Sequence, residues 1–160
     1  MICGFISDVN DIELAAMVDG NGWGKCSGLR TLFPSLLSEL KKVIYVDTDT
    51  IFVDSPNNLW KHFTLMNGLQ VVAAAPDQPL LLRCSYNQET RFPSPPGGLQ
   101  SGVMLMNLQL MRRVRFEKIM FKINQYLRNY FVLPDQDALN VFGGLYPEMI
   151  YMQVFIFGSN

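Results

Sequence analysis

The sequence is poor in cysteine, histidine and charge. Its three cysteines are too few and too scattered for a disulfide scaffold or a cysteine-rich zinc site. Its single histidine, His62, excludes zinc motifs built on two histidines and leaves one base for a Ser-His-Asp triad. Charged residues make up 17% of the chain, against roughly 25% in typical domains. With a net charge of -1, the chain has no overall attraction to nucleic acid or acidic membranes.

Long apolar runs are also absent. No stretch approaches the roughly 20 apolar residues that a membrane-spanning helix needs. Residues 1–8 lack the charged start and long apolar core of a signal peptide, so we expect neither a signal nor an anchor in this chain. Apolar residues nevertheless form 49% of the 160 residues, which is enough to bury the core of one domain.

Apolar runs and helical periodicity alternate along the chain. Alternation of this kind predicts an α/β domain with a mostly parallel central sheet flanked by helices. The proline-rich segment 76–96 predicts a long loop. Helices are expected over 8–18, over 28–41 with an interruption at Pro34, from Ser55 to about Phe63, over 108–131 and from Asp135 onward. Strands are expected over 43–46, 51–53, 69–75 and 103–107.

The sharpest chemical signal is a pair of carboxylates, Asp47 and Asp49, directly after an apolar strand. In α/β sheets, ligands bind beyond the carboxyl ends of strands. Two carboxylates two residues apart at such a point can reach one hard cation, and Mg²⁺ or Mn²⁺ often shares such ligands with substrate phosphates. A solvated turn explains the same pattern without a metal, so the pattern alone leaves both interpretations open.

Several kinds of site could use this motif. An EF-hand loop would need glycine where Phe52 stands and glutamate where Asn58 stands, so it is excluded. A haloacid-dehalogenase-type phosphatase would use Asp47 as nucleophile and Asp49 as acid/base, but Ile51 replaces a Thr or Val of that pattern. A nucleotide-sugar transferase would use both carboxylates to hold a metal on a diphosphate leaving group. The phosphatase, the transferase and a non-catalytic binding protein stay open at this point.

Four segments in order resemble family 8 glycosyltransferases: 26–33, 41–53, 100–107 and 135–140. The segment with the Asp-Thr-Asp motif is most similar to the glucoside xylosyltransferases, which add xylose to O-linked glucose on EGF-like repeats. The resemblance places the central part of a glycosyltransferase domain at 25–148, an N-terminal segment outside it at 1–24 and a C-terminal tail at 149–160.

The resemblance implies a GT-A-like, Rossmann-related fold and a retaining transfer of a sugar, xylose above all, from a UDP-sugar to O-linked glucose on a protein. It also implies the lumen of the ER or Golgi as the location. Asp47 and Asp49 would bind Mn²⁺, or Mg²⁺, together with the UDP diphosphate. The other implied site residues are Arg30, Gln100, Ser101 and Gly102 at the donor and, as catalytic residues beside the donor sugar and acceptor hydroxyl, Asp135, Gln136 and Asp137.

The chain departs from the family pattern in several respects. Gln100 stands where the family usually has asparagine, and nothing after Asp137 supplies the family's histidine ligand. Residues 1–24 are too short for the first strands of the family's sheet. We therefore expect an incomplete domain that holds Mn²⁺ weakly and has little activity alone. Ordinary structural roles also fit some of these residues, such as a surface ion pair for Arg30 and a helix N-cap for Asp135.

Overall fold

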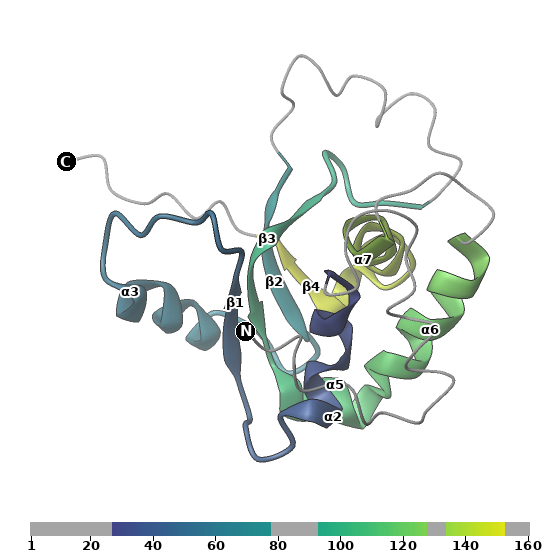
Figure 1. Ribbon diagram of the computed structural model, residues 1–160, viewed down its shortest axis with the longest axis horizontal. Helices are drawn as coiled ribbons and strands as arrows, with labels where there is room; N and C mark the ends of the chain where they lie inside the picture. Colours follow the sequence, from purple (N-terminus) through teal and green to yellow (C-terminus); the bar gives the residue numbers. More distant parts are fainter. Residues whose placement is uncertain (1–26, 78–92, 128–133, 153–160) are drawn as a thin grey trace.

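The computed structural model describes residues 27–77, 93–127 and 134–152 (Figure 1). The N-terminal segment 1–24, with its predicted helix, and most of the predicted loop 76–96 lie outside the described residues. The described elements are η2 (Ser27–Leu32), α2 (Phe33–Leu36), β1 (Val43–Val46), α3 (Pro56–Lys61), η3 (His62–Thr64), β2 (Val72–Pro76), β3 (Leu99–Met106), α5 (Leu108–Val114), α6 (Phe116–Leu127), α7 (Pro134–Leu145), η4 (Pro147–Met149) and β4 (Ile150–Met152).

A four-stranded sheet in the order β1-β3-β2-β4 forms the centre of the described structure. Strand β3 pairs antiparallel with both β1 and β2, whereas β4 pairs parallel with β2. Strands β1, β2 and β4 therefore share one direction, and β3 runs against them. Three of the four described strands are thus mutually parallel, as the prediction of a mostly parallel sheet implies, whereas β3 pairs antiparallel with both of its neighbours. The apolar pattern of a strand predicts its burial but not its direction, and β3 inserts between two strands that are parallel to each other.

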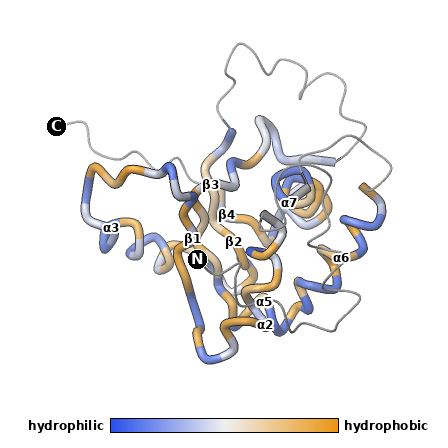
Figure 2. Tube along the Cα trace, in the orientation of Figure 1, coloured by the Kyte–Doolittle hydropathy of each residue, from blue (hydrophilic) through white to orange (hydrophobic). Residues whose placement is uncertain are grey.

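Helices cover both faces of this sheet, which confirms the predicted α/β class (Figure 1). Side chains along a strand alternate between its two faces. On one face, Met104 and Met106 of β3 pack in the main core with α5, α6 and α7. On the other face, Leu105 packs against Leu59 and Phe63 of α3 and η3. Figure 2 shows hydrophobic residues concentrated along the strands between these two helical layers.

The local prediction for α3 is confirmed. Ser55 caps the helix by accepting a hydrogen bond from Asn57 N at 3.3 Å, and Pro56 occupies the first turn. The predicted strand over 51–53 is wrong, because Ile51 is 84% exposed and Val53 is 70% exposed. The chain turns away from the sheet directly after β1, so an apolar run here does not become a strand.

The helix predicted over 108–131 is two helices in the described structure. Arg115 adopts a left-handed conformation with φ of 56° and ends α5, and α6 begins at the next residue. The sequence has no glycine at this break, although glycine is the usual residue in that conformation. The predicted helix over 28–41 is likewise shorter, since α2 ends at Leu36.

The predicted tail 149–160 contains a strand of the sheet. Residues Ile150–Met152 form β4, which pairs with β2 from Val72 to Ala74. A strand of three residues is too short to be recognised by alternation, and its sheet partner decides its structure. None of the helices in the described ranges has the length and apolar character to cross a membrane.

Candidate functional site

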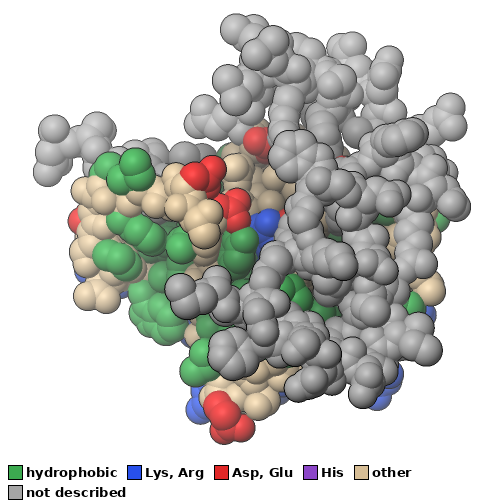
Figure 3. Space-filling view, in the orientation of Figure 1, with side chains coloured by type: hydrophobic (Ala, Val, Ile, Leu, Met, Phe, Trp, Pro, Cys, Tyr) green, Lys and Arg blue, Asp and Glu red, His purple; other side chains and the backbone are tan. Residues whose placement is uncertain are grey.

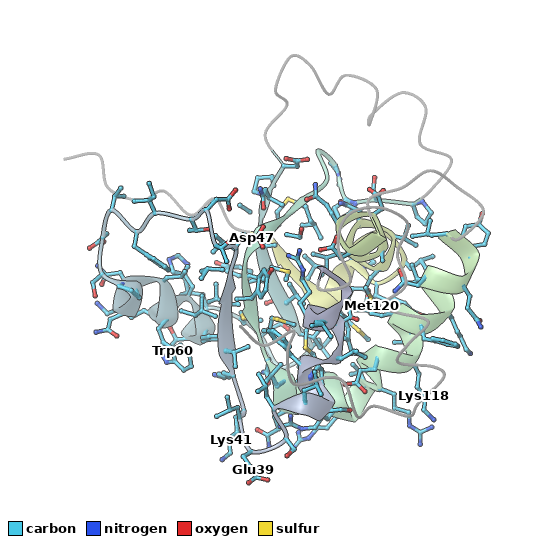
Figure 4. The ribbon with its side chains drawn as sticks, viewed as in Figure 1. Glu39, Lys41, Asp47, Trp60, Lys118 and Met120 are labelled. Atoms are coloured by element: carbon cyan, nitrogen blue, oxygen red, sulfur yellow. The ribbon has the colours of Figure 1, made fainter. Side chains whose placement is uncertain are left out.

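The predicted site residues come together at one edge of the sheet. Because β3 runs antiparallel to β1, the first residues of β3 lie beside the last residues of β1: Val46 is opposite Val103, and Asp47 N donates to Gly102 O at 2.8 Å. The end of β2 reaches the same edge, with Pro76 opposite Leu99. Asp47 is seen at this end of β1 in Figure 4.

The first turn of α7 completes the site. It carries Asp135 and Asp137. Arg30 of η2 forms an ion pair with Asp135 and donates from Nη1 to Ser101 O at 2.6 Å. Ser101 Oγ in turn donates to Gln136 Oε1 at 3.1 Å. These contacts connect η2, β3 and α7, although their residues lie up to about a hundred positions apart in the sequence.

Arg30 is the cation at the centre of this arrangement. It is only 8% exposed, so it does not form the surface ion pair that its residue type would favour. Its guanidinium lies 3.8 Å from Asp47 Oδ1 and its Cζ lies 4.4 Å from the centroid of the Tyr45 ring. A buried guanidinium is stable only when it is paired and hydrogen-bonded, and here a carboxylate, a carbonyl and an aromatic ring surround it.

Tyr45 is a site residue that the sequence analysis missed. Its hydroxyl donates to Asp47 Oδ1 at 2.5 Å. Burial of the phenol, the hydrogen bond to Asp47 and the negative charges of Asp47 and Asp135 raise the pKa of Tyr45 to about 12, against a smaller opposing effect of Arg30. The hydroxyl therefore keeps its proton at physiological pH. The signal for it in the sequence is the spacing, because residues two apart on a strand share one face.

Gly102 makes room for the end of the Asp47 side chain. A Cβ at this position would lie 3.0 Å from Asp47 Oδ2 and 2.9 Å from Gln100 Oε1. Gln100 Oε1 also accepts a hydrogen bond from Gly102 N. A glycine at this position therefore allows the close approach of two polar side chains.

Asn140 supports this edge from α7 and was also missed as a site residue. Its Oδ1 accepts from Leu99 N at 2.6 Å, and its Nδ2 donates to Leu99 O at 3.3 Å and to Gln136 O at 2.9 Å. The amide therefore acts as a strand partner for the beginning of β3. Asp77 adds a further contact, accepting from Gln136 Nε2 at 3.4 Å. Asn140 lies inside the predicted segment 135–140, whereas no pattern in the sequence indicated Asp77.

These contacts bring together most of the predicted site residues, namely Arg30, Asp47, Gln100, Ser101, Gly102, Asp135 and Gln136. Asp49 and Asp137 are not joined by them. Asp49 is exposed just beyond Asp47, and Asp137 is buried in the first turn of α7 with 7% exposure. Figure 3 shows acidic atoms beside basic atoms at this end of the sheet.

The donor set fits a divalent cation that is shared with a ligand. Within the described ranges, no group of three or more His, Cys, Asp or Glu residues could enclose a metal ion. Asp47 is 39% exposed at the edge of the sheet and Asp49 is exposed beside it, so both can offer carboxylate oxygens outward. Mg²⁺ and Mn²⁺ accept one or two carboxylates when substrate phosphates complete their coordination.

Comparisons with known proteins identify the family of this chain. The model of the family described as glycosyl transferase family 8 matches residues 6–153, a wider range than the motifs at 25–148. Glucoside xylosyltransferase 2 of Xenopus laevis is 32% identical over 139 residues, which cover 79% of this chain and 33% of that protein. Human glucoside xylosyltransferase 1 is 31% identical over 139 residues, covering 79% of this chain and 32% of that protein. The chain spans about a third of the length of these curated relatives.

Solved structures share the fold. Mouse xyloside xylosyltransferase 1 in its apo form superposes with a TM-score of 0.65 at 22% identity, covering 89% of this chain and 57% of that chain. An active-site mutant of LgtC superposes with a TM-score of 0.66 at 23% identity, covering 82% of this chain and 48% of that chain. These neighbours have the GT-A fold, which confirms the fold that the resemblance implied. Since the family model covers nearly the whole sequence, this chain belongs to glycosyltransferase family 8.

Proposed function

We propose that this chain is the part of a retaining glycosyltransferase that binds a UDP-sugar and a divalent cation, with xylose as the sugar and O-linked glucose on a protein as the acceptor. The observation that carries the proposal is the convergence of Arg30, Asp47, Gly102 and Asp135 at one edge of the sheet. The names of the relatives, glucoside xylosyltransferases, support xylose and a glucoside acceptor. EGF-like repeats as acceptors and the lumen of the ER or Golgi belong to the same proposal.

In this proposal, Asp47 and Asp49 hold Mn²⁺, or Mg²⁺, which when bound neutralises charge on the departing diphosphate. Arg30 connects α7 with the end of β1, because it forms an ion pair with Asp135 and approaches Asp47. Ser101 and Gly102 present the start of β3 to the donor, where a glycine permits close contact with a sugar. Gln136, oriented by Ser101 Oγ, and Asp135 and Asp137 line the donor sugar and the acceptor hydroxyl.

A titration of UDP with and without Mn²⁺ tests the proposed binding. We expect wild-type affinity for UDP to rise at least tenfold with Mn²⁺, and we expect Asp49→Asn to abolish this rise. Asp54→Asn is the matched control, because Asp54 is an exposed carboxylate further along the same loop. UDP binding that ignores both the metal and the Asp49→Asn change would refute the proposal.

A transfer assay tests the sugar and the acceptor. UDP-xylose, UDP-glucose and UDP-galactose are each supplied with an EGF-like peptide carrying O-linked glucose, and with the same peptide lacking it. Transfer that requires UDP-xylose and the O-linked glucose supports the full proposal. Metal-dependent UDP binding without transfer would favour a non-catalytic binding protein of the same fold. Membership of family 8 leaves the phosphatase interpretation without support.

A further inference from the structure

Tyr45 connects the two charged groups at the centre of the site. It lies on β1 two residues before Asp47, which directly follows the strand, and its hydroxyl donates to Asp47 Oδ1. Its ring lies under the guanidinium of Arg30, at 4.4 Å from the ring centroid to Cζ. The ring also packs against Phe33, with 6.0 Å between the two ring centroids. The tyrosine is thus held by its ring and offers its hydroxyl in a defined direction.

Both oxygens of the Asp47 carboxylate have a defined environment. The Tyr45 hydroxyl and the Arg30 guanidinium approach the same oxygen, Oδ1, at 2.5 Å and 3.8 Å. The other oxygen, Oδ2, lies over Gly102, where even a methyl group would come within 3.0 Å of it. Since Oδ1 is engaged by the protein, Oδ2 is the oxygen left to face a ligand beyond the end of β1.

We propose that Tyr45 is a positioning residue for the cation site: its hydroxyl holds Asp47 Oδ1, so that Asp47 presents Oδ2 to the cation and the diphosphate. This inference rests on the proposed function. A hydrogen bond to a ligating carboxylate orients it for the metal, and the loss of such outer partners typically costs about 10- to 100-fold in metal affinity or activity. Tyr45 acts through Asp47 and does not itself contact the cation.

A purely structural role for Tyr45 is separable from this one. The ring supplies the packing against Phe33 and Arg30, whereas the hydroxyl supplies the hydrogen bond to Asp47. Tyr45→Phe removes the hydroxyl and keeps the ring, and Tyr45→Leu removes both. If only packing mattered, the phenylalanine variant would behave as the wild type and the leucine variant alone would change.

The experiment measures Mn²⁺ affinity of the 160-residue chain in the presence of UDP, by the electron paramagnetic resonance signal of free Mn²⁺. We expect Tyr45→Phe to weaken Mn²⁺ binding at least tenfold, while its unfolding temperature in EDTA stays within about 2 °C of the wild type. Tyr146→Phe is the control, because it also removes one phenolic hydroxyl, but beyond the far end of α7. Wild-type affinity in Tyr45→Phe would overturn the inference.

A second measurement separates this inference from the proposed function. If the wild type itself shows no Mn²⁺-dependent UDP binding, the proposed function fails. Crystal structures of the wild type and of Tyr45→Phe, both without metal, test Tyr45 independently of that result. A rotated Asp47 carboxylate in the variant supports the positioning role, and an unchanged carboxylate refutes it.

Discussion

Both ends of β3 contain buried residues, but the two ends are held in different ways. At the site end, Ser101 is 4% exposed and is surrounded by polar partners, including the Arg30 guanidinium and the Gln136 amide. At the core end, Leu105 and Met106 are at most 2% exposed and pack in two apolar clusters. The core end is stabilised by non-directional burial, which tolerates small shifts of its neighbours. The site end is stabilised by directional contacts, which determine where each charge lies.

This difference indicates which residues mainly determine stability and which mainly determine ligand binding. Apolar residues of the core, such as Phe116, should contribute mainly to folding. Polar residues of the site end should affect ligand binding even where they contribute little to folding. The following substitutions, from the largest expected effect to the smallest, test that separation.

Phe116→Ala should cause the largest loss of stability. Phe116 is 2% exposed and packs edge-on against Phe142, with ring centroids 5.0 Å apart. Removing a buried phenylalanine typically costs about 3–5 kcal/mol of unfolding free energy, through lost burial and the cavity that remains. Urea unfolding measures the loss. Lys118→Ala, on the exposed side of the same helix, is the control and should change stability by less than about 0.5 kcal/mol. A loss of stability no larger than that of Lys118→Ala would contradict the assignment of Phe116 to the core.

Arg30→Met should lower both stability and UDP binding, by a different mechanism that acts at the site end of β3. The substitution leaves Asp135 buried, at 10% side-chain exposure, without its cation, and breaking such a pair costs about 3 kcal/mol. The double variant Arg30→Met with Asp135→Leu removes both charges and should recover most of that loss, while UDP binding stays weak. Urea unfolding and UDP titration together distinguish the two effects. A double variant no more stable than Arg30→Met would show that an unpaired carboxylate is not the cause.

Gly102→Ala should affect function more than folding. Its methyl group would meet only the flexible ends of Gln100 and Asp47, at 2.9 Å and 3.0 Å, so we expect a stability loss below about 1 kcal/mol. The displaced Asp47 carboxylate should weaken Mn²⁺ binding about tenfold. Gly68→Ala is the matched control, because a Cβ there would meet nothing within 4 Å. Equal Mn²⁺ affinities in the two alanine variants would argue against the close fit around Asp47.

The smallest effect concerns the response of the site end to alkaline pH. The pKa of Tyr45 is raised from 10.0 to about 12 in the folded protein. Ionisation of Tyr45 therefore destabilises the fold as the pH rises from 10 towards 12, whereas no such loss occurs below pH 10. Tyr45→Phe should show a shallower loss of stability between pH 10 and 12 than wild type, as measured by urea unfolding at each pH. Parallel curves for the two proteins would contradict the raised pKa.

Local features of this structure could be predicted from local sequence. Ser55 and Pro56 mark the start of α3 because capping depends on neighbouring backbone groups alone. The sequence also predicts that Asp47 and Asp49 follow a strand, because the β-branched apolar run before them is typical of one. The structure confirms this strand as β1. The resemblance to family 8 added Arg30 and Ser101, whose roles no local pattern indicates.

The remaining features depend on contacts between distant segments. The exposure of Ile51, the left-handed break at Arg115 and the strand at Ile150–Met152 all depend on what the rest of the chain places beside them. The direction of β3 also depends on contacts between distant segments. It matters most for the site, because an antiparallel β3 is what places Gly102 beside Asp47.

The sequence by itself determined the chemistry of this protein: which carboxylates, which guanidinium and which glycine are available, and on which elements most of them lie. Only the tertiary structure decided how they meet. Arg30 is buried, and an unpaired buried charge would cost the fold much free energy. The guanidinium is therefore stable only with its partners Asp135, Ser101 and Tyr45. That requirement acts between segments far apart in the chain, because Arg30 of η2 meets Asp135 of α7 and Ser101 of β3 only in the folded structure.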